Sequence, residues 1–347
     1  MPQTDLTQGH VPLSLARLTA PMMMGVSSSI LVQVLEMGFI GQLSTAHVAA
    51  ITFTFPLTMV LTSIALGISI GTSSVIARSV GQQSHSRSDS DDVQRLGTHS
   101  LILVTVAMSI LAALCWLALD PIFLALGASA EMLPLIHSYL DIYLPGSVFF
   151  TTSMILGSIM RANGSATAPG IIMTVGSLVH LVLDPILIFG WFGLPAMELS
   201  GAAIAMTVTR FATLIVTLVF VFKGNMVLNS EHFRAFFAST KRILHVGIPA
   251  IATNLIGPVT AAYITRLMAN YGETAVAGFG VAGRIESVAA MLLFALSGSI
   301  GPFVGQNLGA KRLDRVRQGV RRATSSHYSG GSPWLYQCSF SVRPSQV

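Results

Sequence analysis

The sequence predicts an all-α polytopic membrane protein, and three observations support this fold class. The mean hydropathy is +0.71, and 52% of the residues are hydrophobic whereas only 10% are charged. A soluble domain has about a quarter of its residues charged. The chain also holds eight apolar stretches close to the ~20 residues that a membrane-spanning helix needs. The third observation is an internal repeat, because residues 21–81 recur without a gap as residues 249–309.

The expected elements follow the apolar runs in chain order. The first six spans end near Phe222 and form a complete lobe, and two more spans follow a polar segment. The eight spans are residues 16–40, 51–77, 97–119, 138–160, 168–192, 201–222, 245–269 and 276–306. The expected domains are an N-terminal six-helix lobe (1–222), a cytoplasmic linker (223–244), a partial C-terminal lobe of two helices (245–323) and a non-membrane tail (324–347).

The repeat indicates how the two lobes are related. Its copies share the pairs Pro21/Pro249, Val48/Val276, Ala49/Ala277, Val60/Val288, Ser69/Ser297 and Gly81/Gly309. Because six spans separate the copies, both copies begin on the same side of the membrane. We therefore predict a parallel six-helix repeat whose axis runs along the membrane normal.

The basic residues are distributed unevenly along the chain. Most of the 19 lysines and arginines lie at the start of span 1 or near the loops after spans 2, 4, 6 and 8. The other loops carry only acids, such as Asp120, Glu131, Glu198 and Glu273. By the positive-inside rule, the N-terminus and the even-numbered loops are cytoplasmic in a bacterial inner membrane. The pI near 9.6 therefore reflects topology, and we expect no nucleic-acid partner.

The end of the chain departs from the repeat. A second unit equal to the first would extend to about residue 450. The sequence ends at Val347, and after Ala323 it is Ser-rich and has no apolar run where another span is expected. We interpret this as a frameshift or an early stop near codon 323 in a longer ancestor. The alternative is a genuine eight-span protein with a disordered tail.

Two acids lie inside apolar spans, where ionisable groups are costly and are functional hypotheses by default. They are Glu36 in span 1 and Asp184 in span 5, and Pro185 follows Asp184. A carboxyl in an apolar cavity can take up a proton near neutral pH. Alternatively, the two carboxylates could hold Na⁺, which prefers oxygen ligands. His180, one helical turn before Asp184, could relay the proton. The competing interpretations are an ion pair with Arg210 and, for His180, a helix-packing role.

Span 8 carries Arg284 and Glu286 only two residues apart, so the two side chains lie on different faces of the helix. Their partners are then expected on other helices. We predict structural ion pairs for both residues, or a role in gating.

Small residues recur within the spans. Residues 67–71 match G-x-S-x-G, but that motif needs a strand–turn–helix elbow and here it lies in mid-span. Close helix packing explains these residues better, as it does Gly301, Gly305 and Gly309 at steps of four in span 8. The sequence also has no H-E-x-x-H motif, no metal-binding cysteine pair and no G-x-x-x-x-G-K phosphate loop. We therefore expect no enzyme, no catalytic residue, no metal centre and no bound cofactor.

Several motifs occur together in this chain. They are Gly41-Gln42-Leu43, ALGISIGTSSVIARSVGQ at 65–82, Arg161–Gly164, LDPILIFG at 183–190, Gly201–Ala205, Arg284–Glu286 and GPFVGQNLGAKR at 301–312. From residue 13 to residue 323 this combination resembles the multidrug and toxic compound extrusion (MATE) family. The span 5 acid followed by proline resembles the DinF-type branch of that family.

The resemblance implies twelve spans in two lobes that form a V, and export of cationic or amphipathic compounds against entry of H⁺ or Na⁺. The N-lobe acids of the family fall on Glu36 and Asp184. Position 36 is commonly Asp in the family, and position 180 is commonly Asn, so that His180 favours protons over Na⁺. The absence of spans 9 to 12 would remove much of one wall of the central cleft.

The combined interpretation is an ion-coupled antiporter, using H⁺ or Na⁺, that exports cationic or amphipathic drugs and toxic organic compounds. Truncation could leave it inactive. Its partners would be the small organic cation or amphipathic substrate and the lipid bilayer, and we expect a monomer. The alternatives are a lipid-linked precursor flippase of the same superfamily and a non-transporting membrane fragment.

Overall fold

The computed structural model describes residues 6–82, 90–227 and 235–328. Seven helices in this part of the chain are long and apolar enough to cross a membrane: α1 (Val11–Gly41), α2 (Thr45–Gln82), α3 (Ser90–Leu117), α5 (Leu133–Ala162), α6 (Thr167–Phe189), α7 (Glu198–Lys223) and α8 (Phe236–Ala269). The others are the 37-residue α9 (Glu273–Gly309), α10 (Leu313–Tyr328), the short α4 (Leu119–Ala125) and a 3-10 turn at Trp191–Gly193. The described residues contain no β-strand, and the all-α membrane class is confirmed.

The eight predicted spans correspond in order to α1, α2, α3, α5, α6, α7, α8 and α9. Their bounds differ where polar turns continue a helix beyond its apolar run. α8 begins at Phe236, so residues 236–244 of the predicted linker are the first part of this helix. α10 ends at Tyr328 and includes the first residues of the predicted tail. Linker residues 228–234 and tail residues 329–347 lie outside the described residues.

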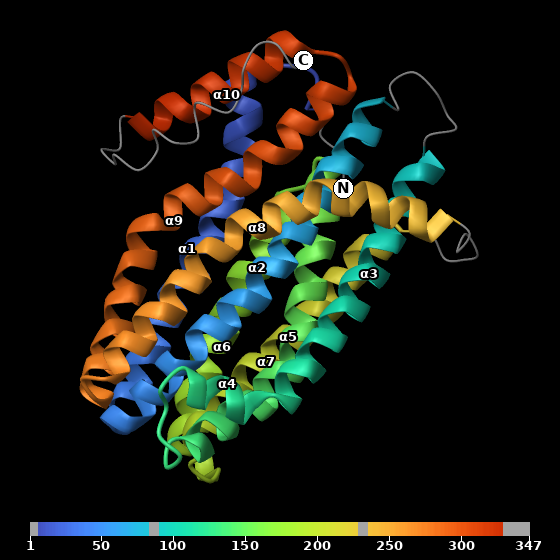
Figure 1. Cartoon of the computed structure of the whole chain (residues 1–347). Helices are drawn as coiled ribbons and strands as arrows, with labels where there is room; N and C mark the ends of the chain where they lie inside the picture. The colour runs from blue at the N-terminus through green and yellow to red at the C-terminus, as the bar shows by residue number, and fades with distance from the viewer. Residues whose placement is uncertain (1–5, 83–89, 228–234, 329–347) are drawn as a thin grey trace.

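The helices of the predicted second lobe, α8 and α9, lie directly against those of the predicted first lobe (Figure 1), and the division into these domains stays a prediction. α5 packs against α2, α3 and α7, while α6 packs against α1 and α7. α8 lies along α2, and α9 lies along both α1 and α2. α10 and the C-terminal end of α2 lie at the upper end of the bundle in Figure 1, and α4 lies at the opposite end. We call the end that carries α10 the basic end.

The packed interior and the apolar surface are on different helices. Leu61 and Ile76 of α2 and Leu140 of α5 are at most 1% exposed and belong to the main core. By contrast, α6 and α7 present exposed apolar side chains, among them Val182 and Phe211. In a lipid bilayer an apolar outer face is expected, because lipid tails are as apolar as these side chains and nothing drives the face inward. Helix association there depends instead on packing and on polar contacts.

α2 and α9 touch at positions that are counterparts in the repeat. A Cβ built on Gly280 would lie 2.0 Å from Thr52 Oγ1, and one built on Gly305 would lie 2.6 Å from Ala77 Cβ. In both pairs the residue numbers differ by 228, the offset of the repeat (280 − 52 and 305 − 77). A two-fold axis along these helices would bring each such residue against its own counterpart. The contacts support the parallel repeat, which as a whole stays a prediction.

The segment before α1 is bound by residues of α9 and α10. The Arg315 guanidinium donates to the backbone carbonyls of Leu6, Gln8 and Gly9 at 3.1, 3.0 and 2.6 Å. The Asn307 amide also donates to the Leu6 carbonyl at 3.1 Å, and its oxygen accepts from Arg315 Nε at 2.9 Å. These bonds tie the segment before α1 to α9 and α10 at the basic end.

Replacing Arg315 by Ala is expected to release this segment, because three carbonyls lose a charged donor. Hydrogen bonds to charged groups contribute about 1.5–3 kcal/mol each, so amide exchange near residues 6–9 should accelerate about tenfold or more. Hydrogen–deuterium exchange with mass spectrometry measures this rate. The control is Arg317→Ala, an exposed arginine two residues on in the same helix. Equal exchange in the two variants would show that Arg315 does not hold the segment.

Candidate functional site

α1 and α6 run side by side in the same direction, and their register decides which residues meet. A Cβ built on Gly25 would lie 2.9 Å from Met173 Cβ, so the two helices approach closely there. One turn further, the hydroxyls of Ser29 and Ser177 lie 2.9 Å apart. Both pairs are 148 residues apart (173 − 25 and 177 − 29). The same offset continues along the two helices to the buried acids.

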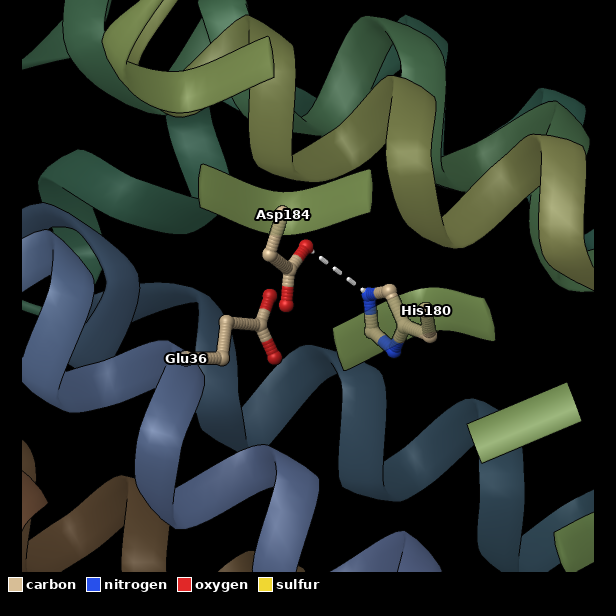
Figure 2. A group of neighbouring side chains, drawn as sticks. All are labelled: Glu36, His180 and Asp184. Carbon is tan, nitrogen blue, oxygen red and sulfur yellow. Dashed lines mark ion pairs between the residues drawn. The ribbon is translucent and has the colours of Figure 1, made fainter. Parts of the chain in front are cut away.

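Glu36 and Asp184, again 148 residues apart (184 − 36), face each other inside the bundle with His180 beside them (Figure 2). Glu36 is 5% exposed and Asp184 is 0% exposed. The His180 side chain is 12% exposed. One ligand atom from each of the three residues lies within 4.8 Å of the other two. The structure thus brings together all three residues that the sequence analysis singled out for ion coupling. Their roles stay predictions.

The Asp184 carboxylate lacks well-aligned donors. His180 Nε2 lies 3.1 Å from Asp184 Oδ1, which is an ion-pair distance. Within the described residues, however, neither Asp184 oxygen nor His180 Nε2 makes a hydrogen bond of good geometry. Burying a charge without aligned partners is unfavourable. A proton or a cation bound between the carboxylates would relieve this, so the cluster is suited to take up either one.

Two guanidinium groups and a phenol complete the surroundings. The charges of Arg210 on α7 and Arg284 on α9 act on Glu36, but neither arginine forms an ion pair with an acid in the described part of the chain. The predicted alternative of an Arg210 ion pair is therefore not seen. Tyr139 of α5 is 5% exposed, interacts electrostatically with Glu36, and was not singled out from the sequence. Nothing in its apolar sequence context distinguishes it from a packing tyrosine.

Arg284 reaches from α9 to α1 and α2. Its Nη1 donates to Gln33 Oε1 of α1 at 2.7 Å, one turn before Glu36. Its guanidinium carbon also lies 4.9 Å from the ring centroid of Phe55 on α2. Glu286 is exposed. No ion pair forms at Arg284 or Glu286 among the described residues, and a gating role for them stays a prediction.

The donor set of the cluster is chemically mixed. Each of the three residues could offer one atom to a metal ion, and the atoms converge. Carboxylate oxygens suit hard cations such as Na⁺, whereas an imidazole is a better ligand for a proton or a transition metal. The expectation that no metal binds here stays a prediction.

Titratable groups inside a bundle of apolar helices mark ion and substrate pathways, and a membrane transporter is the class of protein that they indicate here. The family model MatE matches residues 21–186 and 249–326. The chain therefore belongs to the MatE family of transporters, and the family resemblance of the sequence is confirmed. The DinF-type branch stays a prediction.

Two proteins similar to this chain are named for different cargoes. The chain is 33% identical over 315 residues to the FAD transporter of Shewanella oneidensis, covering 88% of this chain and 67% of that protein. It is 26% identical over 296 residues to the multidrug export protein MepA of Staphylococcus aureus, covering 84% of this chain and 63% of that protein. The chain spans about two thirds of the length of these relatives.

Solved structures show the same fold. A crystal structure of a mutant of the Vibrio cholerae MATE transporter VcmN has a TM-score of 0.79 and 29% identity, covering 90% of this chain and 69% of that one. A transporter of the MOP superfamily from Pyrococcus furiosus has a TM-score of 0.83 and 24% identity, covering 95% of this chain and 72% of that one. This second likeness shows the fold alone.

Proposed function

We propose that this chain exports small cationic or amphipathic organic compounds across the bacterial cytoplasmic membrane in exchange for protons. The observation that carries the proposal is the buried cluster of Glu36, His180 and Asp184, in which two carboxylates face each other inside an apolar bundle. The MatE match and the MepA relative support efflux as the direction of transport. The basic end, where Arg315 lies, would face the cytoplasm by the positive-inside rule.

Competition for the two carboxylates would couple cargo to protons. Two neighbouring carboxylates cannot both stay ionised in an apolar site without a counter-charge. A proton supplies this charge, and so does the cationic group of a cargo molecule. Because both would occupy Glu36 and Asp184, binding of one displaces the other, and this exclusion is the requirement for antiport.

Movement of the lobes would present the cluster to one side of the membrane at a time. α8 packs on α2, and α9 packs on both α1 and α2. Glu36 lies on α1 one turn after Gln33, which Arg284 of α9 contacts. Rocking of the second-lobe helices against the first lobe is the motion that such repeats use for alternating access. The bond from Arg284 to Gln33 crosses the same contact and would have to break or re-form during the motion.

Protons fit the cluster better than Na⁺. His180 places an imidazole 3.1 Å from Asp184, and an imidazole accepts a proton near neutral pH but is a weak ligand for a hard cation. A Na⁺ site would need further oxygen ligands in its place.

Proteoliposomes with an imposed proton gradient test the proposal. Addition of ethidium, a small aromatic cation, is expected to make protons leave acid-loaded vesicles, and a pH-sensitive dye reports this flux. A Na⁺ gradient at equal pH is expected to drive no ethidium movement. Ethidium movement driven by Na⁺ alone would contradict proton coupling. No ethidium movement under either gradient would contradict transport and support the alternative of a non-transporting membrane fragment.

A dinucleotide is the second candidate cargo, because the Shewanella relative at 33% identity is named an FAD transporter. FAD carries a negatively charged pyrophosphate, which the acids of the cluster would repel. A positive group near the cluster would then be required. FAD added to the same vesicles separates this candidate from the cationic one.

A further inference from the structure

Arg210 on α7 places its guanidinium group inside the predicted first lobe, where it has no charged partner among the described residues. Its Nη1 is buried and makes no hydrogen bond, and its side chain forms no ion pair within the described residues. Its central carbon lies 4.9 Å from the ring centroid of Tyr143 and 4.5 Å from that of Phe150, both on α5. Its charge also acts on Glu36 and His180, so it belongs to the surroundings of the acid cluster.

The aromatic contacts leave the donors of Arg210 unused. Cation–π contacts engage the face of a guanidinium, whereas its N–H groups point outward in its plane. A planar fork of N–H donors matches a carboxylate or a phosphate in bidentate geometry. Arg210 is therefore held by Tyr143 and Phe150 with its anion-binding edge unoccupied by any side chain that the structure describes.

A structural role alone does not explain this arrangement. If Arg210 served only as a counter-ion for the acids, an ion pair with Glu36 or Asp184 would be expected, and none forms in the described part of the chain. An unpaired cation in an apolar interior is costly. An anionic group brought in by a ligand would remove that cost.

We propose that Arg210 binds a carboxylate or phosphate group of cargo whose cationic group occupies the carboxylates of Glu36 and Asp184. This inference rests on the proposed function, because it assigns a cargo to the same site. It makes Arg210 a specificity-determining residue that favours molecules with both charges over simple cations.

Two matched dyes test the assignment. Rhodamine 110 carries a free carboxylate, whereas rhodamine 123 is its methyl ester and has the same rings and the same cationic charge. Equilibrium binding to the full chain in nanodiscs, followed by fluorescence anisotropy, measures both affinities without requiring transport. Arg210→Gln is expected to weaken rhodamine 110 binding about tenfold, the equivalent of one bidentate charged contact, and to leave rhodamine 123 within about twofold.

Two further variants keep this test decisive. Arg210→Lys keeps the charge but lacks the fork, and it is expected to retain part of the preference for rhodamine 110. Arg266→Gln, the same change at an exposed position on α8, is expected to alter neither affinity. Equal weakening of both dyes in Arg210→Gln, or no change in either, would overturn the proposal. Loss of proton coupling in the vesicle assay with the dye preference intact would instead overturn the proposed function.

Discussion

Cargo-driven proton movement is expected to fall to background when Asp184 is replaced by Asn. The amide has nearly the same shape as the carboxyl group, so packing around this fully buried position should be kept. It cannot ionise, however, and it leaves Glu36 without the opposing carboxylate and His180 without its acid. A group that cannot change its charge cannot exchange a proton for a cation. The vesicle assay with ethidium measures the loss.

The matched control is Asp141→Asn. Asp141 is also an aspartate of a membrane-spanning helix, but it lies outside the cluster and is bonded to His137 and Trp116. We expect this variant to keep proton movement near the native level. Native flux in Asp184→Asn would remove Asp184 from the mechanism. Equal loss in both variants would point to a general effect of replacing acids in these helices.

The cluster could be predicted from the sequence only in part. Glu36 and Asp184 are recognisable because ionisable residues are rare within apolar spans, and His180 because it precedes Asp184 by one turn. Their approach to one another depends on the register of α1 and α6, which Gly25 and Ser29 set through contacts with another helix. No pattern within a single span contains that information.

The positions around the cluster show the same limit. Arg210 is conspicuous in an apolar span, and an ion pair is the natural expectation for it. The structure places its guanidinium against Tyr143 and Phe150 instead. Which charges meet across helices is decided by tertiary packing, and hydropathy does not report it. Tyr139 carries no signal of its own, because tyrosines are enriched in membrane helices at the interfaces and nothing in the sequence shows which of them lies inside the bundle.

The spans themselves were predictable because ~20 apolar residues are a requirement of the bilayer. The ends of the helices were less so, as α8 shows. Its first turns contain polar residues, so the helix begins at Phe236, well before its apolar run.

The spacing of Gly301, Gly305 and Gly309 predicts close packing at all three positions. The structure shows close packing at Gly305 and Gly309 but not at Gly301, because no described atom would lie within 4 Å of a Cβ on Gly301.

Replacing Gly309 by Ala is expected to destabilise the contact between α9 and α2 strongly. The added Cβ would lie 2.2 Å from the backbone oxygen of Arg78, and a Cβ on the repeat counterpart Gly81 would lie 2.1 Å from the backbone oxygen of Gln306. In both cases the obstacle is backbone, so no side-chain rotation can relieve the overlap. Overpacking of this kind costs about 1–3 kcal/mol, and we expect similar losses from Gly309→Ala and Gly81→Ala.

Gly301→Ala provides the control for this prediction, because it makes the same change on the same helix where the described residues leave open space. Thermal unfolding of the purified full chain in one detergent should show a lowered melting temperature for the first two variants and a native one for the control. Since α2 and α9 also form a contact between the two predicted lobes, ethidium flux should fall with the melting temperature. Native stability in both Gly309→Ala and Gly81→Ala would mean that α2 and α9 do not approach as closely as the structure shows.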